Sequence, residues 1–314
     1  MTQLSTSSAR VIDPILSTVA QGYQNSELVG SALFPTVSVG QRAGKIIQFG
    51  KESFMAYDTA RAPGSAVKRI TTGYSSASYG INDHALSAVV PVELQEEAQA
   101  VPGISLATAA VRTVQDILRL RLEIEQATLA TTAGNYSASN KTTLSGTSQW
   151  SDLTSGVSDP IANIETAKEA IRASTGKRPN VVVMGPSVFK SLKQHPKIID
   201  RIKYTGRDVP TTELLAMLFG VQSVLVGDAI ASDDLGAFSD VWGKFVSVCY
   251  TEQSGIADLG RPTFGYTYQL AGYPFVEQPY YDNTTRSWLY DVADAVKPVI
   301  AAPLAGYLIS AAVA

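Results

Sequence analysis

Residues 104–131 read ISLATAAVRTVQDILRLRLEIEQATLAT, and they carry the strongest helical pattern in the sequence. Apolar side chains recur along it at the spacing of one helix face, while arginines and acids four residues apart occupy the other side. The apolar positions are Val111, Val114, Ile117, Leu118, Leu122 and Ile124, and the charged pairs are Arg112–Asp116, Arg119–Glu123 and Arg121–Glu125. We therefore predict one helix over the whole stretch. At ~1.5 Å per residue it is roughly 40 Å long, which predicts an elongated molecule.

The segments before this helix predict an extended arm and a long hairpin. Residues 1–43 show little periodicity, apart from a short helix expected near residues 13–20. GKIIQFGKES (44–53) and TTGYSSASYGI (71–81) favour two strands, joined through a Pro-Gly tip that carries Arg61, Lys68 and Arg69. An isolated hairpin is marginal in water, so we expect this one to lie on another surface. Aromatic side chains of the arm and hairpin are expected to supply contact area there, namely Phe34, Phe49, Phe54, Tyr57, Tyr74 and Tyr79.

The segments after the helix predict an α+β unit. Residues 135–159, NYSASNKTTLSGTSQWSDLTSGVSD, are polar and rich in Gly and Ser, which is typical of a loop or linker. Asp159-Pro160 is expected to start a helix that ends near Thr175, followed by a strand at 180–184 and helices near 187–194, 196–203 and 211–219. After Gly220 the pattern indicates mostly strands.

The stretch NVVVMGPSVFKSLKQHP (180–196) poses a functional question, because a strand that feeds a helix through a glycine can hold a phosphate. A P-loop needs two glycines followed by Lys and Ser or Thr, and a dinucleotide fingerprint needs three glycines. This turn has only Gly185, and helix initiation explains Pro186 and Ser187. A nucleotide-binding α+β enzyme using residues 185–187 is kept as an alternative function.

The remaining candidates for chemistry do not form a recognisable set. His84 and His195 are the two histidines, and Cys249 lies in a strand-like run, where a lone cysteine is usually a small buried hydrophobe. Asp228, Asp233 and Asp234 are typical of a solvated turn, and no G-x-S-x-G motif occurs. We therefore expect no catalytic residues, no metal and no cofactor.

The charge and the hydropathy of the chain limit which partners it is expected to bind. The formal net charge of −3 gives no global attraction for nucleic acid or acidic membranes. MTQLSTSSAR lacks the apolar core of a signal peptide, which favours synthesis in a reducing interior. PVIAAPLAGYLISAAVA (298–314) is shorter than a membrane span and is predicted to be a strand with a tail, so no membrane partner is expected.

One basic cluster stands out: Lys190, Lys193, Lys197, Arg201, Lys203 and Arg207. Its first four members would share a helix face, but Pro196 is expected to break that helix and bend the stripe. A solvated face, a subunit interface and a phosphate-contacting patch are all compatible with this pattern.

In the order of its segments, and in the share of the chain that they cover, the sequence resembles the major capsid proteins of tailed bacteriophages. The matching stretches are QGYQNSELVGSALFPTVSVGQRAGKIIQFGKESF, YGINDHALSAVVPVELQEEA, SGTSQWSDLTSGVSDPI, PNVVVMGPSVFKSLKQHPKIIDRIK and LLAMLFGVQSVLVG, with a weaker match at GYLISAAV. None is a catalytic signature. The resemblance implies an α+β capsid fold with an N-terminal arm (1–43), an extended loop (44–85), a peripheral domain (86–158) with a spine helix (104–131), an axial domain (159–260) and a β-rich return (261–314).

The resemblance also implies a function and partners. Copies would self-assemble into hexamers and pentamers of an icosahedral head that encloses double-stranded DNA, contacted non-specifically. A separate scaffolding protein, a portal and a decoration protein are further expected partners, and the virion, assembled in the bacterial host cytoplasm, is the expected location. The expected inter-subunit contacts are Phe54, Arg61, Lys68, Arg69, Lys190, Lys193 and Lys197. An encapsulin-like protein compartment shares this fold and is kept as an alternative.

Overall fold

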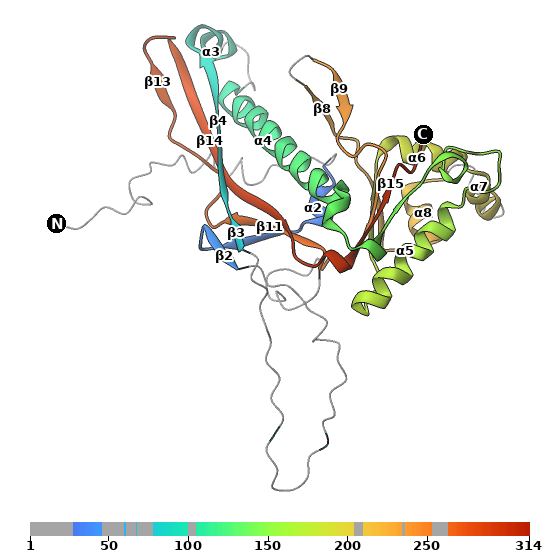
Figure 1. Cartoon of the computed structure of the whole chain (residues 1–314). Coiled ribbons are helices and arrows are strands. Elements are labelled where there is room, and N and C mark those ends of the chain that lie inside the picture. Colours follow the sequence, from blue (N-terminus) through green and yellow to red (C-terminus); the bar gives the residue numbers. More distant parts are fainter. Residues whose placement is uncertain are drawn as a thin grey trace.

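The computed structural model describes residues 28–45, 60, 67, 78–99, 105–203, 210–233, 236–252 and 263–314. Two sheets, each with helices packed on it, make up most of this part of the chain (Figure 1). Among the described residues, no helix is long and apolar enough to cross a membrane.

The first sheet is built on one long strand, β14 (Ser287–Ile300). β4 (Asn82–Pro91) pairs with it antiparallel in unbroken register, from Val296 opposite Asn82 to Ser287 opposite Pro91. The sheet is completed by β1 (Thr36–Val39), β11 (Gly265–Leu270), β12 (Phe275–Val276) and β13 (Tyr280–Asp282). The helix α3 (Val92–Gln99) follows β4 directly. β4 and β14 thus form a long two-stranded ribbon within this sheet.

Helix α4 (Leu106–Thr131) packs against β4 and β14, as Figure 1 shows. Ser105 caps it by accepting a hydrogen bond from the Thr108 backbone N–H. The predicted helix is thus confirmed, with a start two residues later than expected. Val111 and Val114 are buried in the core, but Ile117 and Ile124 are exposed, so the predicted apolar face is wrong at these two positions.

The second sheet has the order β5-β15-β10-β6-β7. Its strands are β5 (Lys141–Thr143), β6 (Val181–Met184), β7 (Ser223–Val226), β10 (Val246–Cys249) and β15 (Gly306–Ser310). β6 and β10 are buried along their whole length because helices and loops cover both faces. The helices around this sheet are α5 (Pro160–Thr175), α6 (Pro186–Gln194), α7 (Pro196–Ile202) and α8 (Thr212–Phe219). Asp159 caps α5, as predicted, and Gly176 ends it in the left-handed conformation at φ 67°.

Residues 135–159 are not the linker that their polar composition predicted. β5 pairs with β15 in the second sheet, and Trp150 is fully buried in the core of that sheet. Asn140 is buried too, and its side-chain amide donates to the carbonyls of Leu304 and Gly306. Buried side chains of this kind are spaced too irregularly for a periodicity argument to find them.

The described residues include the base of the predicted hairpin. β2 (Ala43–Lys45) pairs antiparallel with β3 (Ser78–Gly80), which confirms the pairing of its two ends. Phe54, Arg61, Lys68 and Arg69, and the short helix expected near residues 13–20, lie outside the described residues.

Residues 28–39, expected in an extended arm, belong instead to the first sheet and its surroundings. They form α2 (Gly30–Leu33) and β1, which runs parallel to β11. Two of the aromatic side chains expected to contact neighbours are used within the chain. Phe34 is fully buried against Phe264, and Tyr79 stacks on Tyr268 with ring centroids 4.2 Å apart.

A small hairpin projects from the second sheet and was predicted only as a solvated turn. It consists of β8 (Ile230–Ser232) and β9 (Phe238–Asp240), paired antiparallel (Figure 1). Phe238 is 73% exposed and Ile230 is 52% exposed, so this hairpin carries its apolar side chains away from both cores.

Candidate functional site

Three of the predicted contact residues, Lys190, Lys193 and Lys197, lie on α6 and α7. His195 ends α6 and caps α7, so the helix breaks at Pro196 as predicted. Lys197 pairs with Asp159 at 3.0 Å, whereas no ion pair among the described residues involves Lys190 or Lys193. Both are exposed, and the Lys193 ammonium lies 4.3 Å from the Phe189 ring centroid. Within the basic cluster, Lys197 and Lys203 therefore have acidic partners, whereas no ion pair among the described residues involves Lys190, Lys193 or Arg201; Arg207 lies outside the described residues.

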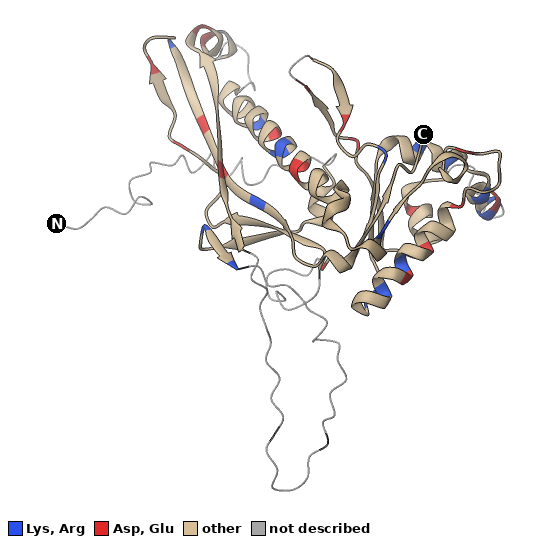
Figure 2. Cartoon of the chain, in the orientation of Figure 1, with Lys and Arg blue, Asp and Glu red and all other residues tan. Residues whose placement is uncertain are grey.

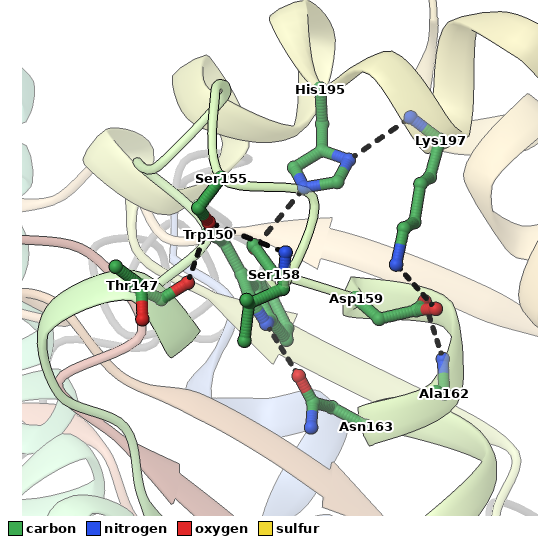
Figure 3. A network of polar contacts seen from close by, with 10 residues as sticks. Thr147, Trp150, Ser155, Ser158, Asp159, Ala162, Asn163, His195 and Lys197 are labelled. Atoms are coloured by element: carbon green, nitrogen blue, oxygen red, sulfur yellow. Dashed lines mark hydrogen bonds and ion pairs between the residues drawn. The ribbon is translucent and has the colours of Figure 1, made fainter.

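The break between α6 and α7 is held by a network of polar contacts (Figure 3). His195 Nδ1 accepts from the Lys197 backbone N–H at 3.3 Å, and its Nε2 is 3.1 Å from the Ser158 hydroxyl. These contacts require the neutral imidazole, protonated on Nε2. Burial and the nearby Lys197 charge lower the pKa of His195, in agreement with that assignment. Asp159 ties the network to α5 by accepting from the Ala162 N–H at 3.0 Å.

Charged side chains of both signs lie along α4 and α5, as Figure 2 shows. Arg121 and Glu125 on α4 approach to 3.9 Å, which confirms one of the predicted pairs. Exposed pairs of this kind contribute little to stability. Among the described residues, no group of three or more His, Cys, Asp or Glu side chains could hold a metal ion.

The turn at residues 185–187 is filled by the protein itself. A side-chain carbon built on Gly185 would lie 1.8 Å from the Gly243 carbonyl oxygen, so nothing else can occupy that space. The Ser187 hydroxyl also points to this carbonyl, at 3.4 Å. The Val-rich run before the turn is the buried core strand β6. The glycine thus serves the close approach of two backbone segments, and this site offers no cradle for a phosphate.

Glu123 on α4 accepts hydrogen bonds from three residues that are distant in the sequence, although the sequence analysis placed it on the charged side of the helix. It is only 2% exposed. Its carboxylate accepts from the backbone N–H groups of Val29 and Gly30 at 2.9–3.0 Å and from Trp242 Nε1 at 2.7 Å. Burial raises the pKa of Glu123, opposed by these hydrogen bonds. One side chain thereby joins the first described residues, α4 and the loop before β10.

Comparisons with known proteins identify the family. The model for phage major capsid protein E matches residues 129–301. The major capsid protein of Burkholderia phage BcepMu is 36% identical over 308 residues, covering 97% of each chain. This chain belongs to the phage major capsid proteins. The function predicted from the sequence, a structural subunit of a phage capsid, is confirmed at this level.

Solved structures support the same fold for this capsid protein. A phage-related protein from Bordetella bronchiseptica is 43% identical, with a TM-score of 0.84 over 97% of this chain and 98% of that chain. The SrpI encapsulin of Synechococcus elongatus matches with a TM-score of 0.50 at 11% identity, over 92% of this chain and 89% of that chain, which shows likeness of fold alone. The predicted α+β capsid fold is confirmed.

The structure of the capsid protein also shows what the sequence analysis missed. Gln115, Glu123 and Gln126 are buried on α4, and Trp242 is buried beside Glu123. The glycine at position 30 is a weak sign of this buried junction, because a side chain there would collide with Gln126 and Glu123. A glycine at the start of a short helix does not, without the structure, identify its partners on a helix more than ninety residues away.

Proposed function

We propose that copies of this capsid protein form the hexamers and pentamers of a closed icosahedral phage head around double-stranded DNA. The observation that carries the proposal is the β8–β9 hairpin, which is not packed on either core yet exposes Phe238 and Ile230. Two-stranded hairpins are marginal alone, and large exposed apolar side chains mark contact sites. In a shell of many copies, each such contact is repeated and its stabilisation is multiplied by the closed geometry.

We further propose which residues form each domain of the capsid subunit. Residues 86–158, with α4 as the spine helix, and the first sheet would form the peripheral domain, and residues 159–260 the bulk of the axial domain. Residues 44–85 would be the extended loop, and residues 261–314 return through both sheets. The proposed contacts between copies are Phe54, Arg61, Lys68 and Arg69 from the loop, with Lys190, Lys193 and Lys197 from α6 and α7.

The partners of the shell are proposed from the relatedness of this chain to phage capsid proteins. They are a separate scaffolding protein, a portal, a decoration protein and packaged DNA, with assembly in the host cytoplasm and no catalytic activity of the chain itself. The net charge of −3 gives no global attraction for DNA, so contact with DNA would be local.

A deletion tests the proposal at the extended loop. Removal of residues 54–68 should leave a folded core, because the described elements pack without them, but should abolish closed shells. Circular dichroism and thermal unfolding check the core, and electron microscopy checks the particles. Normal shells from this variant would refute the role given to the loop.

A protein compartment of encapsulin type remains the second candidate, favoured only by the shared fold. The nucleic acid content of purified particles separates the two. DNA protected from nuclease supports a phage head, and packaged protein without nucleic acid supports a compartment.

A further inference from the structure

A cavity of about 940 Å³ lies between α4 and the first sheet. Its wall is formed by α4, α2, β1, β11, β14 and the turn at residues 272–274. Its volume is at the upper end of the range for small-molecule sites. The charged side chains that line it are Arg119, Glu123 and Asp294, and one arginine against two carboxylates gives the wall a formal charge of −1.

One polar atom of the wall lacks a hydrogen bond. Gln115 is 2% exposed, and its side-chain oxygen Oε1 has no hydrogen-bond partner among the described residues. Gln126, a second buried amide on the same wall, donates to the Thr267 hydroxyl at 2.8 Å. Buried acceptors without a partner are rare and costly in folded proteins. A ligand that donates a hydrogen bond to Gln115 would therefore remove this cost.

The two carboxyl groups of the wall favour a positively charged ligand. Glu123 accepts from three neutral N–H groups, as described above. Asp294 accepts from the Gln269 side-chain amide at 3.0 Å and from the Ala295 N–H at 2.9 Å. Burial raises the pKa of both carboxyls, although the nearby Arg119 charge opposes the rise for Asp294. A cation in the cavity would stabilise the ionised form of these buried acids.

The side chains of the wall suit an ammonium group better than a metal ion. Among the described residues, no group of three or more His, Cys, Asp or Glu side chains could hold a metal. An ammonium group needs only acceptors, to which it presents three donors. Leu118, Leu122 and Val296 also line the cavity and offer an apolar surface to a hydrocarbon chain attached to the charged nitrogen.

We propose that this cavity binds an aliphatic amine in its ammonium form, with the nitrogen donating to Gln115 Oε1 and facing the Asp294 carboxylate. These two groups lie on the same part of the wall, because Gln115 is one helical turn, about 6 Å, from Arg119, whose charge acts on Asp294. The hydrocarbon chain lies against Leu118 and Leu122. The bound amine joins α4 to β14, so it stabilises the subunit increasingly as its concentration rises.

Titration of the unassembled chain with pentylamine tests the proposal, with 1-pentanol as an uncharged ligand of the same size. Isothermal titration calorimetry at neutral pH should give a dissociation constant of about 1 mM or lower for pentylamine, which is within reach of a ligand of this size. 1-Pentanol should bind roughly tenfold more weakly or not at all, because its hydroxyl donates without a charge. No measurable binding of pentylamine, or equal binding of the two ligands, would overturn the proposal.

Substitutions locate the ligand within the cavity. Asp294→Asn removes a charge from the wall, and Gln115→Leu removes the unsatisfied acceptor. Each should weaken pentylamine binding roughly tenfold or more. The matched control is Asp291→Asn, the same change three residues earlier on β14, where the side chain is on the opposite face of the strand and outside the cavity wall. This control should keep the affinity of the wild type within about twofold.

Thermal unfolding without ligand separates lost binding from lost folding. Gln115→Leu should unfold at the temperature of the wild type or above it, because it removes a buried acceptor that has no partner. Wild-type affinity in Gln115→Leu or Asp294→Asn, or an equal loss of affinity in Asp291→Asn, would overturn the placement. Since these experiments need no shells, their outcome is independent of the proposed assembly.

Discussion

At the scale of single residues, Glu123 shows why a correct helix prediction does not identify its buried side. Its spacing from Arg119 is that of an exposed ion pair, and nothing local distinguishes it from Glu125. Three donors, from Val29, Gly30 and Trp242, lie 93 to 119 residues away in sequence. Such a convergence depends on tertiary structure, so the sequence alone could not reveal it.

Replacing Glu123 with Ala should lower the free energy of unfolding by roughly 3 kcal/mol, since three buried donors lose their acceptor. Glu123→Gln should cost less, because an amide oxygen can still accept from Trp242 and Val29. Chemical unfolding with both variants measures the difference. If Glu123→Ala were as stable as the wild type, the hydrogen bonds from Val29, Gly30 and Trp242 to Glu123 would not contribute to stability as described.

His195 should make stability depend on pH. The folded state lowers its pKa below the ordinary value of 6.5, so the unfolded state binds the proton more readily. The contribution is therefore complete above pH 6.5 and is lost as pH falls below it, by at most about 1.4 kcal/mol per pH unit. His84, whose pKa burial and Arg121 also lower, adds to the slope in the wild type.

His195→Asn isolates the His195 contribution, because asparagine can still cap α7. Denaturant unfolding between pH 7 and 5 should show a shallower loss of stability in this variant than in the wild type. Parallel pH profiles would mean that His195 keeps an ordinary pKa in the folded protein.

At the scale of elements, α4 allows a matched test of its two sides. Leu118 packs partly buried beside the cluster of Val111, Val114 and Val292, whereas the adjacent Ile117 is 51% exposed. Leu118→Asp should destabilise the protein by about 3 kcal/mol, and Ile117→Asp by less than about 0.5 kcal/mol. Thermal unfolding gives both values. Similar losses in the two variants would show that the assigned face is wrong.

Elements differed in how well the sequence predicted them. Long periodic segments such as α4 and α5 were located to within about two residues, because helix caps and spacing are local signals. The segment 135–159 was mistaken for a linker, because Trp150 and Asn140 are buried by β15 and the segment around Leu304, which come more than 150 residues later. The projecting β8–β9 hairpin was also missed, since three-residue strands leave too short a pattern.

At the scale of the whole molecule, the two sheets with their helices form an elongated subunit with apolar side chains on its projections. Phe238→Ser should leave the unfolding transition nearly unchanged, because the side chain is 73% exposed in the single chain, yet it should impair assembly. Sedimentation analysis of assembly mixtures checks this. The fully buried Phe219 is the contrasting position: Phe219→Ser should unfold the subunit itself. Normal assembly of Phe238→Ser would remove the hairpin from the set of contacts.

Assembly into shells is tested most directly by negative-stain electron microscopy of the purified chain, alone and with the proposed scaffolding protein, beside a sizing column. We expect closed icosahedral particles, or hexameric and pentameric rings that close into particles when scaffold is added. A chain that remains a monodisperse monomer under crowding and with scaffold would contradict this expectation.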